Sequence, residues 1–293
     1  MRQFLKYIAL LFLGIFVILG ILDIIYTSIF RNESARNKTQ FVLSLNNQKI
    51  DYVFLGSSRV ENSIISSEIE KTTSKNTLNL GTQGAIINDM NLYLRLLIKN
   101  EIKISKLFVQ IDYVFNSDKN SNIVYSQALP YLRSNEVIKE YAERKDSKFK
   151  LNYYIPFYRY LVNDYRIGFR EVFASLIKKK SKINFEDGFV PIFGKMKKNE
   201  FSVLPKIIIK ENRGFNEIDS ICMVNEIDVV YFVSPFCKNA KNLSYLKKIK
   251  EKIPELNDFS ALVQEDKYFK NCAHLNEKGA LLFTKKMIEE LDL

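Results

Sequence analysis

An uncharged apolar run near the N-terminus constrains this chain more than any other feature. The segment Tyr7 to Leu22 holds no charged residue, and beyond Asp23 the apolar character continues through Phe30. A helix that spans a bilayer needs ~20 mostly apolar residues, and because this segment is apolar on every face we favour a membrane span over a buried core helix. Arg2 and Lys6 precede the run, which favours a cytoplasmic N-terminus.

We interpret residues 1–31 as an uncleaved transmembrane signal-anchor, with a cleaved signal peptide as the competing interpretation. The apolar run is long, and no A-x-A-like cleavage site follows it. The expected location is the cell membrane, single-pass, with the lipid bilayer as a partner and the C-terminal domain outside the cytoplasm. Arg31, Arg36 and Lys38, just beyond the segment, act against this orientation.

Strand-like and helix-like patterns alternate after a stalk at residues 32–49. Strand-prone runs lie at 51–55, 77–80 and 106–115, and the clearest one lies at 227–236. Helical patterns separate them, and a last short strand is expected at 259–263. Such alternation is typical of a parallel sheet with helices on both faces. We therefore predict a three-layer α/β/α domain, flavodoxin-like in outline, over residues 50–293.

The alternation breaks at about residues 116–210, a stretch rich in aromatic and basic residues. We expect a largely helical insertion over the carboxyl edge of the sheet, where α/β folds place specificity elements. The aromatic side chains are interpreted as local core. Another hypothesis is that this basic, aromatic insertion binds an anionic polymer.

The composition narrows the partners and cofactors. The formal net charge is +11, and the 44 Lys and Arg residues are spread along the chain, as on solvated helix faces with modest attraction to anionic surfaces. No nucleic-acid-binding motif is present, so no nucleic-acid partner is expected. Three cysteines without a CxxC pair, and a single histidine, supply no zinc-ligand set. We expect no metal, no organic cofactor and a fold that does not depend on disulfides.

Three segments are predicted to meet at the carboxyl edge of the sheet. They are "GSSR" after the first strand, "NLGTQGA" after the second, and "NCAHLNEKGA" before the last helix. The first presents the Ser58 hydroxyl at a strand-to-helix turn, and the second offers glycine N–H groups that can approach a ligand closely. His274 is the only histidine of the chain. If an imidazole activates the serine, His274 is the only candidate base.

These segments resemble blocks I, II and V of the SGNH/GDSL hydrolase superfamily, and in particular its membrane-anchored branch that acylates cell-wall polymers and exopolysaccharides. The resemblance covers roughly residues 50–112 and 220–293. It implies that Ser58 is the nucleophile and His274 the base, that the N–H groups of Ser58 and Gly84 form the oxyanion hole, and that Asn79 is the block II asparagine.

The chain departs from the family pattern at two places. Asn271 stands three residues before the histidine, where the family has an aspartate. An asparagine can orient the imidazole only if its carbonyl faces the ring, and it supplies no charge. Block III has Asp112 and no asparagine, so one oxyanion donor is missing or replaced.

Three further residues flank the predicted site and are candidates for substrate binding. Arg59 could bind an anionic substrate group, although a structural salt bridge is the favoured interpretation. Asn79 is expected to support its turn. Asp112 could line the site, and capping of the loop after the third strand is the favoured alternative.

The residues and the resemblance together predict acyl transfer or ester hydrolysis on acyl groups, acetyl above all, of an extracytoplasmic polysaccharide or cell-wall polymer. The preference for transfer rests on the resemblance, which also leaves room for a membrane protein that supplies the acyl group. The alternative hypothesis is an inactive SGNH-like domain that binds glycan or scaffolds an envelope assembly complex.

Overall fold

The computed structural model describes residues 1–293, apart from the side chain of Lys145. The chain forms two compact units. The first, which we call the helical unit, contains Met1–Gln40 and Tyr125–Ser181. The second, the sheet unit, contains Phe41–Val124 and Lys182–Leu293.

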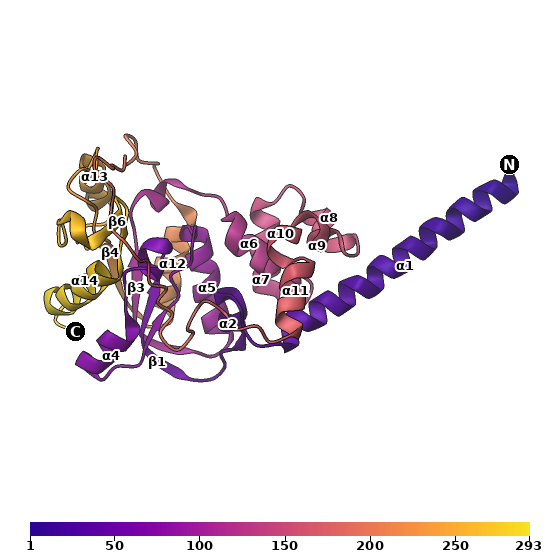
Figure 1. Cartoon of the computed structure of the whole chain (residues 1–293), viewed down its shortest axis with the longest axis horizontal. Coiled ribbons are helices and arrows are strands. Elements are labelled where there is room, and N and C mark those ends of the chain that lie inside the picture. Colours follow the sequence, from indigo (N-terminus) through magenta and orange to yellow (C-terminus); the bar gives the residue numbers. More distant parts are fainter. The chain divides into compact units, whose positions relative to one another are not determined.

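A five-stranded parallel sheet forms the centre of the sheet unit (Figure 1). Its strand order, β2-β1-β3-β4-β5, is that of the flavodoxin-like doubly wound folds. The predicted α/β class is confirmed. The strands are β1 (Lys49–Leu55), β2 (Thr77–Asn79), β3 (Lys103–Gln110), β4 (Asp228–Val233) and β5 (Asn257–Asp258).

The placement of the last strand at 259–263 was wrong. β5 ends at Asp258, and the next residues form a turn. Phe259 and Val263 are buried in the core nonetheless. A short apolar run reports burial and does not by itself distinguish a strand from a buried turn.

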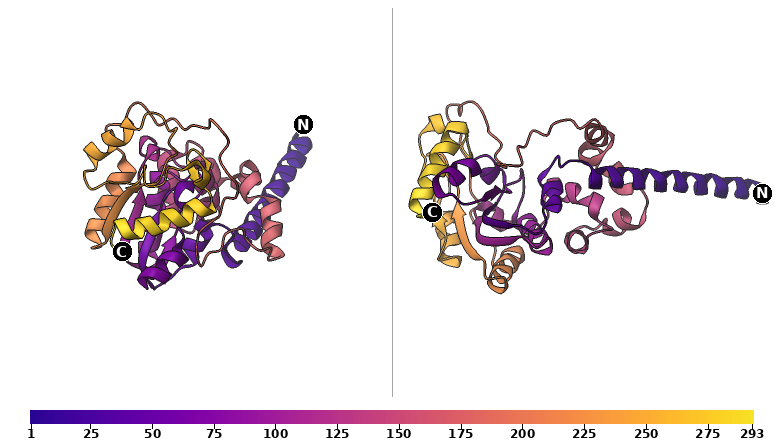
Figure 2. Two further views of the ribbon diagram at one scale, coloured as in Figure 1. Left: turned by 60° about the vertical axis from the view of Figure 1, so that its left-hand side comes forward. Right: turned by 90° about the horizontal axis from the view of Figure 1, so that it is seen from below.

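Helices cover both faces of the sheet. Tyr52 and Phe54 of β1 belong to a buried cluster that also contains residues of α4 (Ser66–Thr73) and α14 (Glu277–Glu290). On the other face α5 (Ile87–Lys99) packs against α12 (Arg213–Val224). Figure 1 shows α14 on one side of the strands and α5 with α12 on the other, and the left view of Figure 2 shows α14, in yellow, lying across the sheet.

Short elements complete the sheet unit. A two-stranded antiparallel hairpin, β6 and β7, precedes α14. The short elements are α2 (Lys38–Ser44), α3 (Ser58–Glu61), η1 (Tyr113–Asn116), α13 (Ser244–Lys252), η3 (Asp266–Tyr268), β6 (Phe269–Asn271) and β7 (His274–Leu275).

The predicted helical insertion is helical in its first two thirds only. Its helices are α6 (Asn122–Ala128), η2 (Leu129–Tyr131), α7 (Glu136–Lys145), α8 (Phe149–Tyr154), α9 (Tyr158–Val162), α10 (Asp164–Ile167) and α11 (Phe169–Leu176). Residues 182–211, which we call the return segment, contain turns and one isolated bridge, Val203 to Lys241. The expectation of helix over this part was wrong because its backbone bonds to other parts of the sheet unit instead of to itself.

The apolar N-terminal run forms α1 (Arg2–Asn32). An 18-residue window of this helix has a mean hydropathy of 3.0 and is only 6% buried, so α1 is not a core helix. By length and composition it can cross a membrane, and a signal sequence has the same properties.

The end of α1 packs within the helical unit, against η2 and α11. Asp23, the acidic interruption of the apolar run, is 4% exposed. Its carboxylate is 2.7 Å from Arg159 Nη2 and 3.0 Å from Arg133 Nη1, and it accepts a hydrogen bond from the backbone N–H of Phe157. Asp23 is therefore the first residue of α1 that is buried in the folded unit.

Candidate active site

The turn after β1 gives its two serines different environments. Gly56 permits the turn, because a Cβ there would lie 2.1 Å from Val60 Cγ2. Ser57 is 3% exposed, caps α3 by accepting from the N–H of Arg59, and donates its hydroxyl to Gln110 Oε1 at 2.9 Å. Ser58 is only partly buried. Ser57 thus holds the turn, and Ser58 is the serine that a substrate can reach.

Ser58, His274 and Asn271 form a continuous hydrogen-bonded relay. Ser58 Oγ lies 2.8 Å from His274 Nε2, and His274 Nδ1 lies 3.0 Å from Asn271 Oδ1. Asn271 Oδ1 also accepts the backbone N–H of Ala273 at 3.0 Å. That N–H can only donate, so the amide oxygen faces the ring. Nδ1 therefore carries the hydrogen, and the lone pair of Nε2 points at the Ser58 hydroxyl.

The imidazole of His274 is neutral at physiological pH. Burial, and then the positive charge of Arg59, lower the pKa of His274 to about 4. Asn271 cannot offset this shift, because an amide carries no negative charge. The ring can accept a proton at neutral pH, but it is a weaker base than an ordinary histidine.

Arg59 connects several segments of the site through buried contacts. Its Nε lies 2.8 Å from Asp112 Oδ2, and neither side chain has any exposed surface. It donates to the carbonyl of Ala273 at 2.7 Å and to that of Ser234 at 2.5 Å, and its guanidinium lies 3.6 Å from the centre of the Phe236 ring. Arg59 therefore joins α3 to the end of β4 and to the loop that carries His274.

Asn79 and Asp112 are buried as well. Asn79 donates to the carbonyl of Val60 in the short helix α3 and to that of Ile64 in the loop after it, and it accepts the N–H of Gly81. Asp112 accepts the N–H of Val114 at the start of η1. Both residues are 0% exposed, so these side chains, like that of Arg59, lie behind the site and present no surface to a substrate.

The two backbone N–H groups that the resemblance assigns to an oxyanion hole belong to Ser58 and Gly84. Neither Ser58 nor Gly84 donates its N–H to a partner within the residues that the structure describes. Gly84 has a φ of +69°, a conformation that glycine adopts at little cost. Gln110, at the end of β3, accepts from Ser57 through its amide oxygen and donates its amide nitrogen to Asp112, so both ends of its amide are occupied.

A disulfide between Cys237 and Cys272 stabilises the histidine loop, and the sequence analysis missed it. Cys272 lies between Asn271 and His274, and Cys237 follows β4 and donates its N–H to the Cys272 carbonyl at 3.0 Å. The expectation that the fold does not depend on disulfides was wrong. A signal existed, because Cys237 directly follows the strand predicted at 227–236, and Cys272 lies within the segment predicted to meet the carboxyl edge of the sheet.

The return segment covers the same region. Val190 donates to the carbonyl of Glu61 at the end of α3, and Asn62 donates back to the Val190 carbonyl. A few residues later, the Gly194 carbonyl accepts from Asn276, which begins α14. The segment thus contacts both the serine turn and the end of the histidine loop. Nothing in its composition predicted this role.

Among the residues described, no group of three or more His, Cys, Asp or Glu side chains could hold a metal ion.

Comparisons with known proteins include a distant structural similarity. No protein-family model and no curated protein matches the chain. A solved structure described as that of "a putative platelet activating factor from Streptococcus pneumonia" aligns with 98% of this chain and 99% of its own, at 12% sequence identity and a TM-score of 0.31.

Proposed function

We propose that this chain is a membrane-anchored serine esterase or O-acyltransferase that acts on ester-linked acyl groups of an extracytoplasmic polysaccharide. One observation carries the proposal: a partly exposed serine hydroxyl lies 2.8 Å from a neutral imidazole whose other nitrogen is oriented by an amide oxygen. A nucleophile, its base and an orienting group within hydrogen-bond reach are what nucleophilic acyl chemistry requires.

The proposed reaction begins with the attack of Ser58 Oγ on the acyl carbonyl carbon. His274 Nε2 takes the hydroxyl proton as the new C–O bond forms, and the carbonyl oxygen becomes an oxyanion. The free N–H groups of Ser58 and Gly84 are the proposed donors to that oxyanion. When the intermediate collapses, His274 returns the proton to the leaving alcohol and the acyl group stays on Ser58.

In the second half of the reaction, His274 takes a proton from water or from an acceptor hydroxyl. Attack on the acyl-serine then breaks the bond between the acyl carbon and Ser58 Oγ. His274 returns the proton to Oγ, and the acyl group leaves as a free acid or as a new ester. The same residues serve both outcomes, so the choice of transfer, and of a polysaccharide as substrate, rests on the resemblance to the SGNH/GDSL superfamily.

The disulfide supports the proposed location. Stable disulfides form in oxidising compartments and are rare in the cytosol. The Cys237–Cys272 bond lies in the sheet unit, so an extracytoplasmic sheet unit behind a membrane-spanning α1 is consistent with it.

The second candidate function is a catalytically inactive glycan-binding domain of an envelope assembly complex. The uncharged Asn271 and the low pKa of His274 favour it, because an imidazole with a pKa of about 4 lacks the base strength of a charge-supported one.

A serine-reactive phosphonate probe and p-nitrophenyl acetate hydrolysis test the proposal on the full-length protein in detergent. We expect labelling of the wild type, no labelling of Ser58→Ala, and a loss of about 10²- to 10⁴-fold in the hydrolysis rate of His274→Ala. Ser220→Ala is the matched control, because this exposed serine bonds only to its own helix. A folded wild-type protein that resists the probe would instead favour the glycan-binding domain.

A further inference from the structure

The first buried residue of α1 lies at a defined depth. Asp23 is buried, whereas most of the large apolar side chains before it, and Ile24 and Ile25 directly after it, are exposed. Arg2 to Leu22 extend ~32 Å at ~1.5 Å per residue, which matches a hydrocarbon core ~30 Å thick. When α1 spans a bilayer, Asp23 and the helix turns beyond it lie at the level of the lipid headgroups.

The rest of the helical unit has a surface suited to that level. Its helices α8 to α11 and their connections expose ten large aromatic and aliphatic side chains, interspersed with basic residues such as Arg166 and Arg170. Exposed tyrosine, phenylalanine and leucine with lysine and arginine are typical of segments that lie in a membrane interface. The apolar set is Leu151, Tyr154, Ile155, Leu161, Val162, Tyr165, Phe169, Phe173, Leu176 and Ile177.

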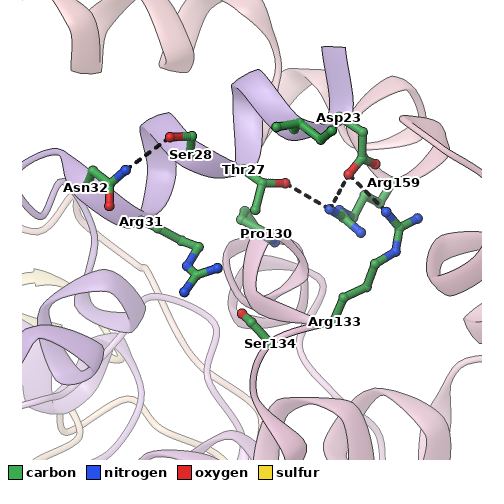
Figure 3. Close-up of a pocket in the computed structure, with 10 residues that line it drawn as sticks. Asp23, Thr27, Ser28, Arg31, Asn32, Pro130, Arg133, Ser134 and Arg159 are labelled. Carbon is green, nitrogen blue, oxygen red and sulfur yellow. Dashed lines mark hydrogen bonds and ion pairs between the residues drawn. The ribbon is translucent and has the colours of Figure 1, made fainter. Parts of the chain in front are cut away.

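An open pocket of about 540 Å³ lies at this level within the helical unit (Figure 3). The last turns of α1 form one wall, and the segment around η2 together with α9 forms the other. Its charged groups are the guanidinium groups of Arg31, Arg133 and Arg159 and the single carboxylate of Asp23. The pocket therefore carries two more positive charges than negative ones, and Ser28 and Ser134 add hydroxyl groups.

Arg159 has unused hydrogen-bonding capacity, whereas each guanidinium nitrogen of Arg133 has a partner within the protein. Arg159 is 1% exposed; its Nη2 contacts Asp23 and Thr27, but its Nε and Nη1 have no hydrogen-bond partner among the described residues. A buried donor without a partner is costly. Arg133 shares the same Asp23 oxygen, and burial together with the charge of Arg159 lowers the pKa of Arg133. An anion in the pocket would supply acceptors for the unpaired donors of Arg159 and would offset the charge repulsion between Arg133 and Arg159.

Arg31 completes the set from the α1 wall. The structure gives it no hydrogen bond or ion pair with any described residue, and in Figure 3 its guanidinium lies beside the pocket near Pro130 and Ser134. Guanidinium groups bind phosphate oxygens in pairs and hold their charge at every physiological pH.

We propose that this pocket binds the phosphate group of an anionic membrane lipid. The charge of the pocket selects an anion, the unused guanidinium donors select phosphate oxygens, and the end of the apolar part of α1 places the pocket among headgroups. The proposal does not depend on the acyl chemistry of Ser58, because every group in it belongs to the helical unit.

Binding to the full-length protein in uncharged detergent tests the proposal by native mass spectrometry. The probes are dioctanoyl phosphatidic acid, dioctanoylglycerol, which has the same tails without phosphate, and inorganic phosphate. We expect phosphatidic acid to bind at least about tenfold more tightly than either of the other two, and Arg31→Gln to weaken it about tenfold. Arg170→Gln, which removes the same charge elsewhere on the unit, should leave the affinity unchanged.

Arg133→Gln provides a second variant within the pocket, and thermal unfolding checks that each variant is folded. Equal losses in Arg31→Gln and Arg170→Gln would overturn the pocket in favour of general charge attraction, as would retained affinity in both pocket variants. Inorganic phosphate that binds as tightly as phosphatidic acid would overturn the lipid assignment and indicate a soluble phosphate ligand.

Discussion

Replacing Asn271 by aspartate should strengthen the base of the proposed site. Asn271 Oδ1 already accepts from His274 Nδ1 at 3.0 Å and from the N–H of Ala273, so a carboxylate in this position needs no new geometry. The substitution adds only a negative charge beside the ring. In serine proteases the reverse change, from aspartate to asparagine, lowers turnover about 10⁴-fold.

The size of the effect follows from the distance. A unit charge ~4 Å from the imidazolium is worth about 4 kcal/mol at an effective dielectric constant of ~20, or about three pKa units. His274 is partly exposed, and solvent reduces this value. We therefore expect the pKa of His274 to rise from about 4 by about two units, and the hydrolysis rate at pH 7 to rise by between about tenfold and 10⁴-fold.

Two assays report the change. His274 is the only histidine, so an NMR titration of its imidazole follows one residue without assignment. The pH profile of p-nitrophenyl acetate hydrolysis is the second, because only the neutral ring acts as a base. For the wild type we expect a rate that holds down to about pH 5 and falls through about pH 4 as the ring gains a proton. In Asn271→Asp the fall should begin at higher pH.

Asn216→Asp serves as the control, because it places the same charge on an exposed position of α12. A raised imidazole pKa without any gain in rate would refute the argument that base strength limits this site. An unchanged pKa in folded Asn271→Asp would refute the geometry of the relay itself.

Three further predictions concern the scaffold of the site. Reduction of Cys237–Cys272, whose cysteines are 35 residues apart, should lower the free energy of unfolding by about 4 kcal/mol and abolish probe labelling, as measured by urea titration with and without reductant. Gly81→Ala should lower the free energy of unfolding by at least about 1–3 kcal/mol, because its Cβ would lie 2.3 Å from a backbone nitrogen of α3. Gly20→Ala is the control in thermal unfolding and should be nearly neutral, because there is open space around Gly20. Arg59→Met should cost about 3–5 kcal/mol in the same measurement, since it leaves a buried carboxylate unpaired; a loss below about 1 kcal/mol would contradict its role as the link behind the site.

The sequence alone was sufficient to predict the parallel sheet of the sheet unit. β1 and β4 are apolar runs bounded by turn residues, and strands of a buried parallel sheet have this pattern. Their carboxyl ends fix where a serine turn and a histidine loop can meet, so the pairing of Ser58 with His274 followed from topology and from the presence of a single imidazole.

Long-range pairings away from the carboxyl edge of the sheet could not be predicted. The partners of Asp23 lie more than a hundred residues away, in an insertion whose helices give no register relative to α1. The same holds for the return segment, because its structure depends on carbonyls and N–H groups of other elements and not on its own periodicity. Composition likewise could not decide whether Arg59 faces a substrate or the core, since the same side chain suits both.

Because the end of α1 packs within the helical unit, the rotation of the proposed anchor about its helix axis is fixed relative to that unit. Asp23 and Phe30 are buried on the helix face that meets η2 and α11, so no flexible joint separates the apolar part of α1 from the folded part. One extra residue before Asp23 would turn everything N-terminal to it by ~100° and raise it by ~1.5 Å relative to the unit. If a foreign membrane helix replaced the residues up to Leu22, we expect function to be preserved only when the new helix keeps the helical register with Asp23. The proposed anchor therefore differs from a flexible tether, which can be exchanged without regard to register.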